Sequence, residues 1–485
     1  MSISAKICLY GCLCKATRVR LPRYLEKNFK MNSWTPESWQ QKQAEQQPDY
    51  QDKAAVADVV DKLSQFPPLV TSWEVESLKS QLAEAADGKR FLLHGGDCAE
   101  SFAGCRSDVI TNKLKILLQM SLVMVHGMDK RVIRIGRFAG QYAKPRSSNT
   151  EVRNGVELPS YRGDLINELG FSASEREPRP ELMLRGYERA ALTLNYIRSL
   201  VEGGFADLHH PENWNLDFMD HAPLAGEYRE VVADIGSSLH FMENILGAQT
   251  GEISRADFFT SHEALLLPYE QAQTRPVPKV SGHYNLSTHF PWLGARTQNP
   301  DGAHVEYLRG IRNPIGLKVG PQMTAGSLMR LLGILDPEHE SGRITLIHRF
   351  GVDMIEDRLP GLIEAVQRGG RKPLWVCDPM HGNTISTKQG LKTRRFDHIL
   401  DELERSFAIH QSAGSYLGGV HFELTGADVT ECVGGARGLE ESDLQRAYKS
   451  QVDPRLNYEQ ALEMAMLVVR AEKRPKSVGE ETAAD

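Results

Sequence analysis

The stretch LWVCDPMHGN, residues 374–383, runs from apolar residues directly into a polar loop. A short apolar run that ends in a cluster of Asp, Pro, Gly and Asn is typical of a buried strand followed by a loop. The loop carries Asp378 and His381, and α/β enzymes place catalytic groups at such strand ends. We therefore interpret it as part of a functional site. The alternative, a helix N-cap beside an incidental histidine, is weakened by other stretches of the same form.

Those other stretches are short strand-like runs with polar or glycine-rich ends, at residues 91–98, 132–137, 257–261, 283–288, 314–319, 343–348 and 418–423. Helices are expected between several of them, at residues 326–335, 354–366 and 396–412. With 374–377 the chain has eight strand–helix units, which predict a (β/α)8 TIM barrel of the α/β class. The fourth run, 283–288, is the weakest because only a short gap separates it from the third.

Two segments carry helical patterns that the barrel does not need. Residues 34–86 form a predicted N-terminal helical extension, with Thr35 and Pro36 at a helix start and Thr71 or Ser72 capping a later helix. Residues 150–250 are too long for a plain loop. Apolar residues recur at helical spacing over 182–197 and 231–246, which predicts a helical hairpin inserted after strand two.

These patterns divide the chain into three parts. Residues 1–33 are a basic extension, expected to be disordered, and it lacks the long apolar region of a secretory signal. An organelle transit peptide and a spurious extension upstream of Met31 remain open alternatives. Residues 34–472 are predicted to form a single catalytic barrel domain that includes the accessory helices. Residues 473–485 form a polar tail that is expected to fray.

Composition narrows the functional class. The 485 residues carry a net charge of −6, which argues against a general nucleic-acid binder. No apolar run approaches the roughly 18 residues of a membrane span. Seven cysteines are few and odd in number, which fits a reducing compartment, and we expect a cytoplasmic protein. The N-terminal cysteines lack histidine neighbours, so a zinc site there is disfavoured.

Polar side chains of two kinds gather where the predicted strands end. The basic ones are Arg137, Lys144, Arg146, Arg296, Lys318 and Arg349, and the potential metal ligands are Cys98, His381, Glu423 and Asp453. In a barrel all of them converge on one face. So many cations in an acidic protein indicate phosphate binding, and one thiolate, one imidazole and two carboxylates suit Mn²⁺, Co²⁺, Fe²⁺ or Zn²⁺ better than Ca²⁺. Each residue alone has an ordinary structural explanation, and only the joint arrangement favours a site.

Several longer motifs resemble one enzyme family. They are GGDCAESF (95–102), GQYAKPRS (140–147), YRGDLIN (161–167), SHEALLL (261–267), NPIGLKVGP (313–321), CDPMHGNT (377–384), HFELTGADVTEC (421–432) and DPRLNYEQALE (453–463). The chain is similar, from about residue 34 to 472, to the class II 3-deoxy-D-arabino-heptulosonate 7-phosphate synthases. This resemblance implies condensation of phosphoenolpyruvate with erythrose 4-phosphate, the first step of the shikimate pathway to aromatic amino acids.

The resemblance also implies residue roles. The metal ligands would be Cys98, His381, Glu423 and Asp453. The phosphoenolpyruvate-binding residues would be Arg137, Ala295, Arg296, Lys318 and Arg349, with Arg296 between the two substrates. The erythrose 4-phosphate-binding residues would be Lys144, Arg146 and Ser147. The metal, expected to be Mn²⁺ or Co²⁺ with Zn²⁺, Fe²⁺ and Mg²⁺ as alternatives, would act as a Lewis acid on the aldehyde.

Two positions depart from the family pattern. Relatives usually carry an acid where Ala295 stands, which changes nothing if only the backbone amide is used. Many relatives carry a cysteine where Val452 stands, so a disulfide from that position to Cys98 is impossible here. Two other functions are alternatives: another phosphoenolpyruvate-dependent sugar-phosphate aldolase, and a non-catalytic regulatory paralogue, which the intact site positions disfavour.

The resemblance has consequences for partners as well. The accessory helices of residues 34–86 and 150–250 carry none of the proposed chemistry, yet their apolar faces must be covered. We expect a homo-oligomer, a dimer or tetramer, with these segments at its interfaces. Aromatic amino acids are expected inhibitors at sites remote from the metal, which requires binding and inhibition to be linked. Neither nucleic acid nor membrane is expected as a partner.

Overall fold

The computed structural model describes residues 34–203 and 257–473, together with residues 226, 230 and 233. The chain divides into two compact units, residues 1–35 and 36–485, and the fold described below belongs to the second. None of the helices described is long and apolar enough to cross a membrane.

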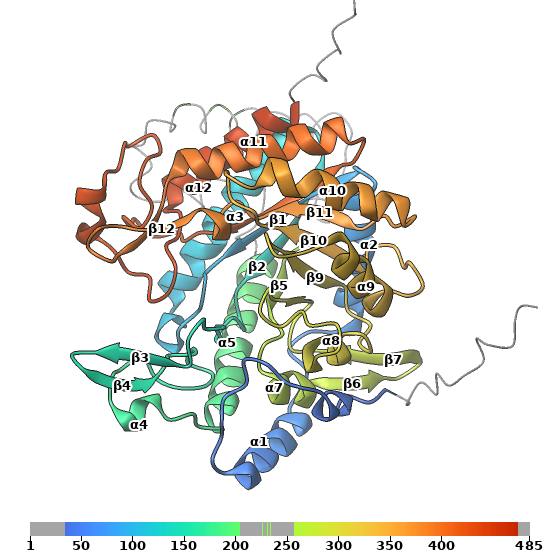
Figure 1. Ribbon diagram of the computed structural model, residues 1–485, viewed down its shortest axis with the longest axis vertical. Coiled ribbons are helices and arrows are strands. Elements are labelled where there is room, and N and C mark those ends of the chain that lie inside the picture. Colours follow the sequence, from blue (N-terminus) through green and yellow to red (C-terminus); the bar gives the residue numbers. More distant parts are fainter. Residues whose placement is uncertain (1–33, 204–225, 227–229, 231–232, 234–256, 474–485) are drawn as a thin grey trace, which may run out of the picture. The chain divides into compact units, whose positions relative to one another are not determined.

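The centre of this unit is a closed barrel of eight parallel strands, in the order β1-β14-β11-β10-β9-β8-β5-β2 (Figure 1). The strands are β1 (Arg90–Gly96), β2 (Arg131–Arg137), β5 (Phe259–Glu263), β8 (Phe290–Leu293), β9 (Ile315–Val319), β10 (Ile344–His348), β11 (Leu374–Cys377) and β14 (Leu417–Glu423). The predicted (β/α)8 barrel is therefore confirmed, and the stretch 374–377 is one of its strands.

The prediction of the fourth barrel strand was wrong. Residues 280–285 belong to β7 (Val280–Asn285), which pairs antiparallel with β6 (Thr274–Val277) outside the barrel. The barrel strand is β8, whose sequence FPWL is buried throughout and pairs with β5, Pro291 lying opposite His262. Because proline donates no hydrogen bond to a strand ladder, it usually argues against a central strand. A short apolar run that contains a proline is therefore hard to identify as a barrel strand from the sequence.

A ring of helices surrounds the barrel. Its members are α3 (Ser107–Met128), α8 (Ala303–Leu308), α9 (Ala325–Leu335), α10 (Ile355–Arg368), α11 (Phe396–Ser412) and α12 (Tyr458–Lys473). Neighbouring members pack against one another, α12 against α3 and α11, and α10 against α9 and α11. The three helices predicted between strands, α9, α10 and α11, are confirmed to within two residues at either end.

Helix α2 (Ser72–Ala86) closes the amino end of the barrel. Its residues Leu78, Leu82 and Ala85 share one buried cluster with side chains from the strands, among them Leu92 of β1 and Phe290 of β8. Thr71 is its N-cap. The Thr71 hydroxyl accepts a hydrogen bond from the Glu74 backbone N–H, and the Glu74 carboxylate accepts one from the Thr71 backbone N–H. The site must therefore open at the opposite, carboxyl end.

The first predicted helix start was wrong. Thr35 and Pro36 precede only the short 3-10 turn η1 (Ser38–Gln41), and the first long helix is α1 (Lys53–Gln65), capped by the Asp52 side chain. The chain between them contains Pro48, and proline disfavours helical backbone at the residue before it. The apolar stripe of α1 lies in a second buried cluster together with residues of α5 (Leu182–Glu202) and α7 (Leu267–Ala272).

The insertion after β2 begins with a hairpin of β3 (Thr150–Arg153) and β4 (Val156–Pro159). Asn154 and Gly155 form its turn, both with positive φ, as expected for an Asn-Gly hairpin. The short α4 (Ala173–Arg176) and long α5 (Leu182–Glu202) follow, which confirms the helix predicted over 182–197. The helix predicted over 231–246 lies outside the described residues, so the inserted helical hairpin stays a prediction.

Candidate active site

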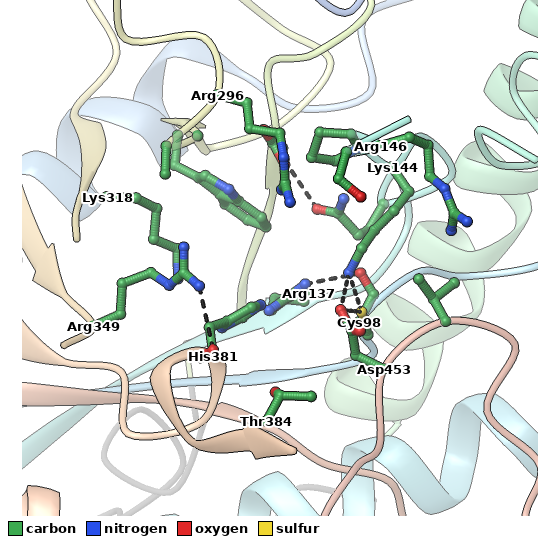
Figure 2. Close-up of a pocket in the computed structure, with 18 of the residues that line it drawn as sticks. Cys98, Arg137, Lys144, Arg146, Arg296, Lys318, Arg349, His381, Thr384 and Asp453 are labelled. Carbon is green, nitrogen blue, oxygen red and sulfur yellow. Dashed lines mark hydrogen bonds and ion pairs between the residues drawn. The ribbon is translucent and has the colours of Figure 1, made fainter. Parts of the chain in front are cut away.

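A cavity of about 270 Å³ opens at the carboxyl end of the barrel (Figure 2). Every residue predicted for the site lines it except Glu423, which lies buried immediately beneath. Figure 2 shows Lys318 and Arg349 on one side, Lys144 and Arg146 on the other, and Arg137 between them. The convergence expected from a barrel is thus observed, although proximity alone does not assign a role to any one residue.

The four proposed metal ligands lie in two touching pairs. His381 Nε2 is 2.9 Å from Glu423 Oε1, and Cys98 Sγ is 3.3 Å from Asp453 Oδ2. Donor atoms of Cys98, Glu423 and Asp453 all lie within 4.8 Å of one another. The ammonium of Lys144 contacts both the Cys98 thiol and the Asp453 carboxylate. A positive charge therefore already sits among these donors.

His381 shows why a metal fits here. Its Nδ1 lies 2.7 Å from Asp378 Oδ2, while Asp378 Oδ1 accepts hydrogen bonds from the backbone N–H groups of Met380 and His381. An ionised Asp378 can only accept, so Nδ1–H of His381 donates to it. Nε2 of His381 then carries a lone pair, which points at the Glu423 oxygen. A cation held by His381 and Glu423 would remove that repulsion, and a histidine oriented by a carboxylate is the usual arrangement around protein-bound metals.

The electrostatics of the donor set point the same way. Burial raises the pKa of the Cys98 thiol well above its usual value, and Glu423 adds to the rise. Although burial opposes it, the neighbouring His381 and Arg394 hold the pKa of Glu423 well below its usual value. Arg394 Nη2 lies 2.8 Å from Glu423 Oε2, and both side chains are fully buried. The carboxylate is therefore ionised at neutral pH, as a metal ligand must be.

The opposite wall of the cavity is a set of tightly held cations. Lys318 Nζ lies 2.6 Å from Asp378 Oδ2, and burial lowers its pKa to about 8 even though Asp378 acts in the other direction. Arg349 donates to the His381 carbonyl over 3.3 Å. Asp378 thus joins a proposed metal ligand to a proposed phosphate-binding lysine.

Sequence reasoning missed several residues of the cavity. These are Gln141, Glu263, Trp292, Thr384 and Lys392, together with the buried Arg394 below. Gln141, Glu263 and Thr384 stood inside the motifs quoted above, and that was their signal. Lys392 and Arg394 belong to the hairpin of β12 (Thr384–Ser386) and β13 (Lys392–Arg394), which no sequence pattern indicated.

Glu263 is the one missed acid in this basic cavity. Burial raises the pKa of its carboxyl although Lys144, Lys318, Arg137 and Arg296 act against the rise. A Cβ at Gly294 would overlap the Glu263 carboxylate, so any larger residue there would displace this buried acid. Ala295 and Val452, the two departures noted above, both line the cavity. Cys98 is a free thiol.

Comparison with known proteins gives one consistent result. A sequence model of the class-II DAHP synthetase family matches residues 34–469. A phospho-2-dehydro-3-deoxyheptonate aldolase from Neurospora crassa is 47% identical over 462 residues, covering 91% of this chain and 96% of that protein. Proteins of the same name from Streptomyces coelicolor and Mycolicibacterium smegmatis are 45% and 42% identical, over 91% and 88% of this chain and 98% and 92% of their own.

Proposed function

Because the chain belongs to the class-II DAHP synthetase family, we propose that the cavity at the carboxyl end of its barrel is where that family's reaction takes place. The activity is that of a 3-deoxy-7-phosphoheptulonate synthase, EC 2.5.1.54. Phosphoenolpyruvate, erythrose 4-phosphate and water give 3-deoxy-D-arabino-heptulosonate 7-phosphate and phosphate, the first step of the shikimate pathway.

One observation carries the placement of the reaction. A buried imidazole–carboxylate pair, His381 with Glu423, adjoins the Cys98–Asp453 pair and faces a cavity wall rich in Arg and Lys. This combination supports metal-dependent chemistry on two phosphorylated substrates. A divalent metal bound by Cys98, His381, Glu423 and Asp453 would supply Lewis acidity toward the aldehyde oxygen. We propose Mn²⁺ or Co²⁺, with Zn²⁺, Fe²⁺ and Mg²⁺ as alternatives.

The residues of the chain then have distinct tasks. Arg137, Lys318 and Arg349 hold phosphoenolpyruvate, and Arg296 with the Ala295 backbone lies between the substrates. Lys144, Arg146 and Ser147 hold erythrose 4-phosphate. The enol carbon of phosphoenolpyruvate forms the new bond to the aldehyde carbon, water adds to C2, and phosphate leaves. Two anionic substrates repel one another, so these cations act mainly by holding them close and aligned.

The assay that tests this function measures release of inorganic phosphate from the full chain with both substrates and Mn²⁺. Chelation should abolish turnover, and Mn²⁺ or Co²⁺ should restore it. Five-carbon sugar phosphates serve as the comparison substrates, because preference for one of them would indicate the other type of phosphoenolpyruvate aldolase. Absence of turnover with every aldehyde and metal would instead favour the non-catalytic paralogue.

The assembly and location of the protein are proposals of the same kind. We propose a cytoplasmic homo-oligomer, a dimer or tetramer, with the accessory helices at its interfaces. The 86% exposed Trp73 of α2 and the half-exposed Leu192 of α5 support this. Light scattering that gives a monomer at micromolar concentration would contradict it. Aromatic amino acids are proposed inhibitors, tested by activity with each at millimolar concentration, singly and combined.

A further inference from the structure

The inside of the barrel contains a polar layer directly below the cavity. His94 of β1, His421 of β14 and Ser261 of β5 are all fully buried there, and His94 and His421 lie side by side in the strand register. Branched apolar side chains dominate these layers in barrels of this type. Buried polar groups are costly unless each has a hydrogen-bond partner, so this layer calls for an explanation.

The three side chains form one continuous chain of hydrogen bonds that begins at Arg137. Arg137 Nη1 is 2.9 Å from His421 Nε2, and His421 Nδ1 is 2.8 Å from His94 Nδ1. His94 Nε2 is 2.6 Å from Ser261 Oγ, which donates to the Gly136 carbonyl over 3.3 Å. This series of hydrogen bonds therefore crosses from β14 to β1 and then to β5, and it ends on β2.

The direction of every bond in this chain follows from its first member. A guanidinium can only donate, so His421 Nε2 must accept and His421 must carry its proton on Nδ1. That proton is donated to His94 Nδ1, so His94 carries its own proton on Nε2 and donates it to Ser261. Both imidazoles are consequently neutral, and they hold opposite tautomers.

This arrangement fixes the Arg137 guanidinium from behind. Its Nη2 donates to the Cys98 carbonyl over 2.9 Å, and its plane lies over the Trp292 ring, with Cζ 5.1 Å from the ring centre. The Nε–H has no hydrogen-bond partner among the residues described. Arg137 lines the cavity, and its Nη1 also lies 3.3 Å from Glu423 Oε1, so the guanidinium that borders the cavity is held by His421, Cys98 and Glu423 together.

We propose that His421, His94 and Ser261 are positioning residues, which orient Arg137 for phosphoenolpyruvate through this one-directional relay. The proposal rests on the proposed function of Arg137. The relay determines which guanidinium N–H groups are occupied and which are left for the substrate. If His421 carried its proton on Nε2, two donors would face each other and the guanidinium would be displaced. The relay prevents this, since His94 accepts only from Nδ1 of His421.

Substitutions at His94 separate this role from simple core packing. His94→Leu removes the acceptor for His421, whereas His94→Asn places an amide oxygen near the Nδ1 position. We expect KM for phosphoenolpyruvate to rise about tenfold in the Leu variant and to return within about threefold of wild type in the Asn variant. KM for erythrose 4-phosphate and kcat should change by less than about threefold. Equal KM values in the two variants, or a loss confined to kcat, would refute the relay.

His410→Leu is the matched control. It also removes a fully buried imidazole, one that is bonded to Ser415 over 2.9 Å on the outer helix α11, and it should leave KM for phosphoenolpyruvate unchanged. Calorimetric binding of phosphoenolpyruvate without the second substrate tests the function proposed for Arg137 separately from the positioning role of His94. A wild-type protein that bound none would refute the function proposed for Arg137. Normal binding by the His94→Leu variant would refute only the positioning role.

A measurement on the wild-type protein decides the matter even if the Leu variant does not fold. Selective ¹⁵N-histidine labelling and long-range ¹H–¹⁵N correlation report the tautomer of each imidazole, and His94→Asn and His421→Gln identify the signals. We expect an Nδ1–H tautomer for His421 and an Nε2–H tautomer for His94. An Nε2–H tautomer of His421, or a doubly protonated ring at either position, would overturn the proposal.

Discussion

The two walls of the cavity differ in how their side chains are held. Arg137 and Lys318 of the first wall, and Glu423 directly beneath the cavity, come from strand ends, are at most a few per cent exposed, and each contacts at least one other buried side chain. Arg146 and Lys392 come from an irregular segment and a small hairpin, with 26% and 46% of their side chains exposed. The difference indicates that the wall proposed for phosphoenolpyruvate is held in place by its own contacts, while Arg146 and Lys392 on the wall proposed for the sugar phosphate are held less firmly. Substitutions on the first wall should therefore cost far more.

The largest effect is expected at Glu423, the buried carboxylate beneath the cavity. Glu423→Gln removes the charge that Arg394 and His381 face, and leaves buried cations uncompensated. Activity should fall roughly a thousandfold, equal to about 4 kcal/mol, and bound metal, measured by elemental analysis, should fall with it. Glu431→Gln, at another buried carboxylate bound by Arg455, is the control for general loss of stability. Full activity with normal metal content in Glu423→Gln would remove this residue from the metal centre.

The next effect concerns Asp378, which holds both Lys318 and His381. Asp378→Asn keeps its shape but loses the charge that orients both partners, so kcat/KM should drop about 10- to 100-fold. Metal affinity and phosphoenolpyruvate affinity should weaken together, as titration calorimetry would show. Weakening of only one of these two affinities would mean that Asp378 does not couple His381 to Lys318.

Arg349 tests the phosphate contacts themselves. Arg349→Ala should weaken phosphoenolpyruvate binding at least about tenfold, because a hydrogen bond to a charged group contributes about 1.5–3 kcal/mol. Arg349→Lys should recover part of the loss, since lysine keeps the charge without the bidentate fork. Unchanged binding by calorimetry would contradict the placement of phosphoenolpyruvate on this wall.

Lys318 predicts a pH effect confined to one substrate. Burial lowers its pKa to about 8, so the ammonium is charged below that pH and neutral above it. KM for phosphoenolpyruvate should rise severalfold from about pH 7 to about pH 9 as the charge is lost, which is the size expected for one charged contact. KM for erythrose 4-phosphate should not follow this profile. A flat phosphoenolpyruvate profile would show that the lysine stays charged throughout.

The smallest effect is expected on the adjustable wall. Lys392 Nζ pairs with Asp453 Oδ1 over 2.7 Å but remains about half exposed, and exposed ion pairs contribute only about 0–1 kcal/mol. Lys392→Met should raise KM for erythrose 4-phosphate by about two- to fivefold without changing phosphoenolpyruvate binding. A loss as large as that at Glu423 would end the distinction between the walls.

The same distinction explains what the sequence could predict. Arg137, Lys318, Arg349 and Glu423 lie at or next to strand ends, and the strand fixes where they point, so a correct strand count places them. Trp292 was not predicted because it lies on β8, and Pro291 makes that strand atypical of a barrel interior. Lys392 was not predicted because it lies on a small hairpin. The position of such a hairpin depends on the residues that it packs against, and the local sequence pattern does not contain that information.

The same limit applied at the start of the helices. Thr35 and Pro36 resemble a helix start in the sequence, but only a short 3-10 turn follows them, and the first long helix described, α1, begins after Asp52, where its apolar residues Val59 and Leu63 are buried. Capping residues in the sequence indicate the positions at which a helix can begin. Long-range packing says where one does.

The closure of the barrel between β1 and β14 has a consequence for how the protein is made. The bond between His94 and His421 joins residues 327 positions apart, and that between Cys98 and Asp453 joins residues 355 apart. Such distant contacts form late, because the entropy of closing a long loop must be overcome first. During synthesis on the ribosome, β1 and Cys98 therefore cannot make these contacts until almost the whole chain has been made. Any nascent chain that ends before β14 has neither a closed barrel nor a site.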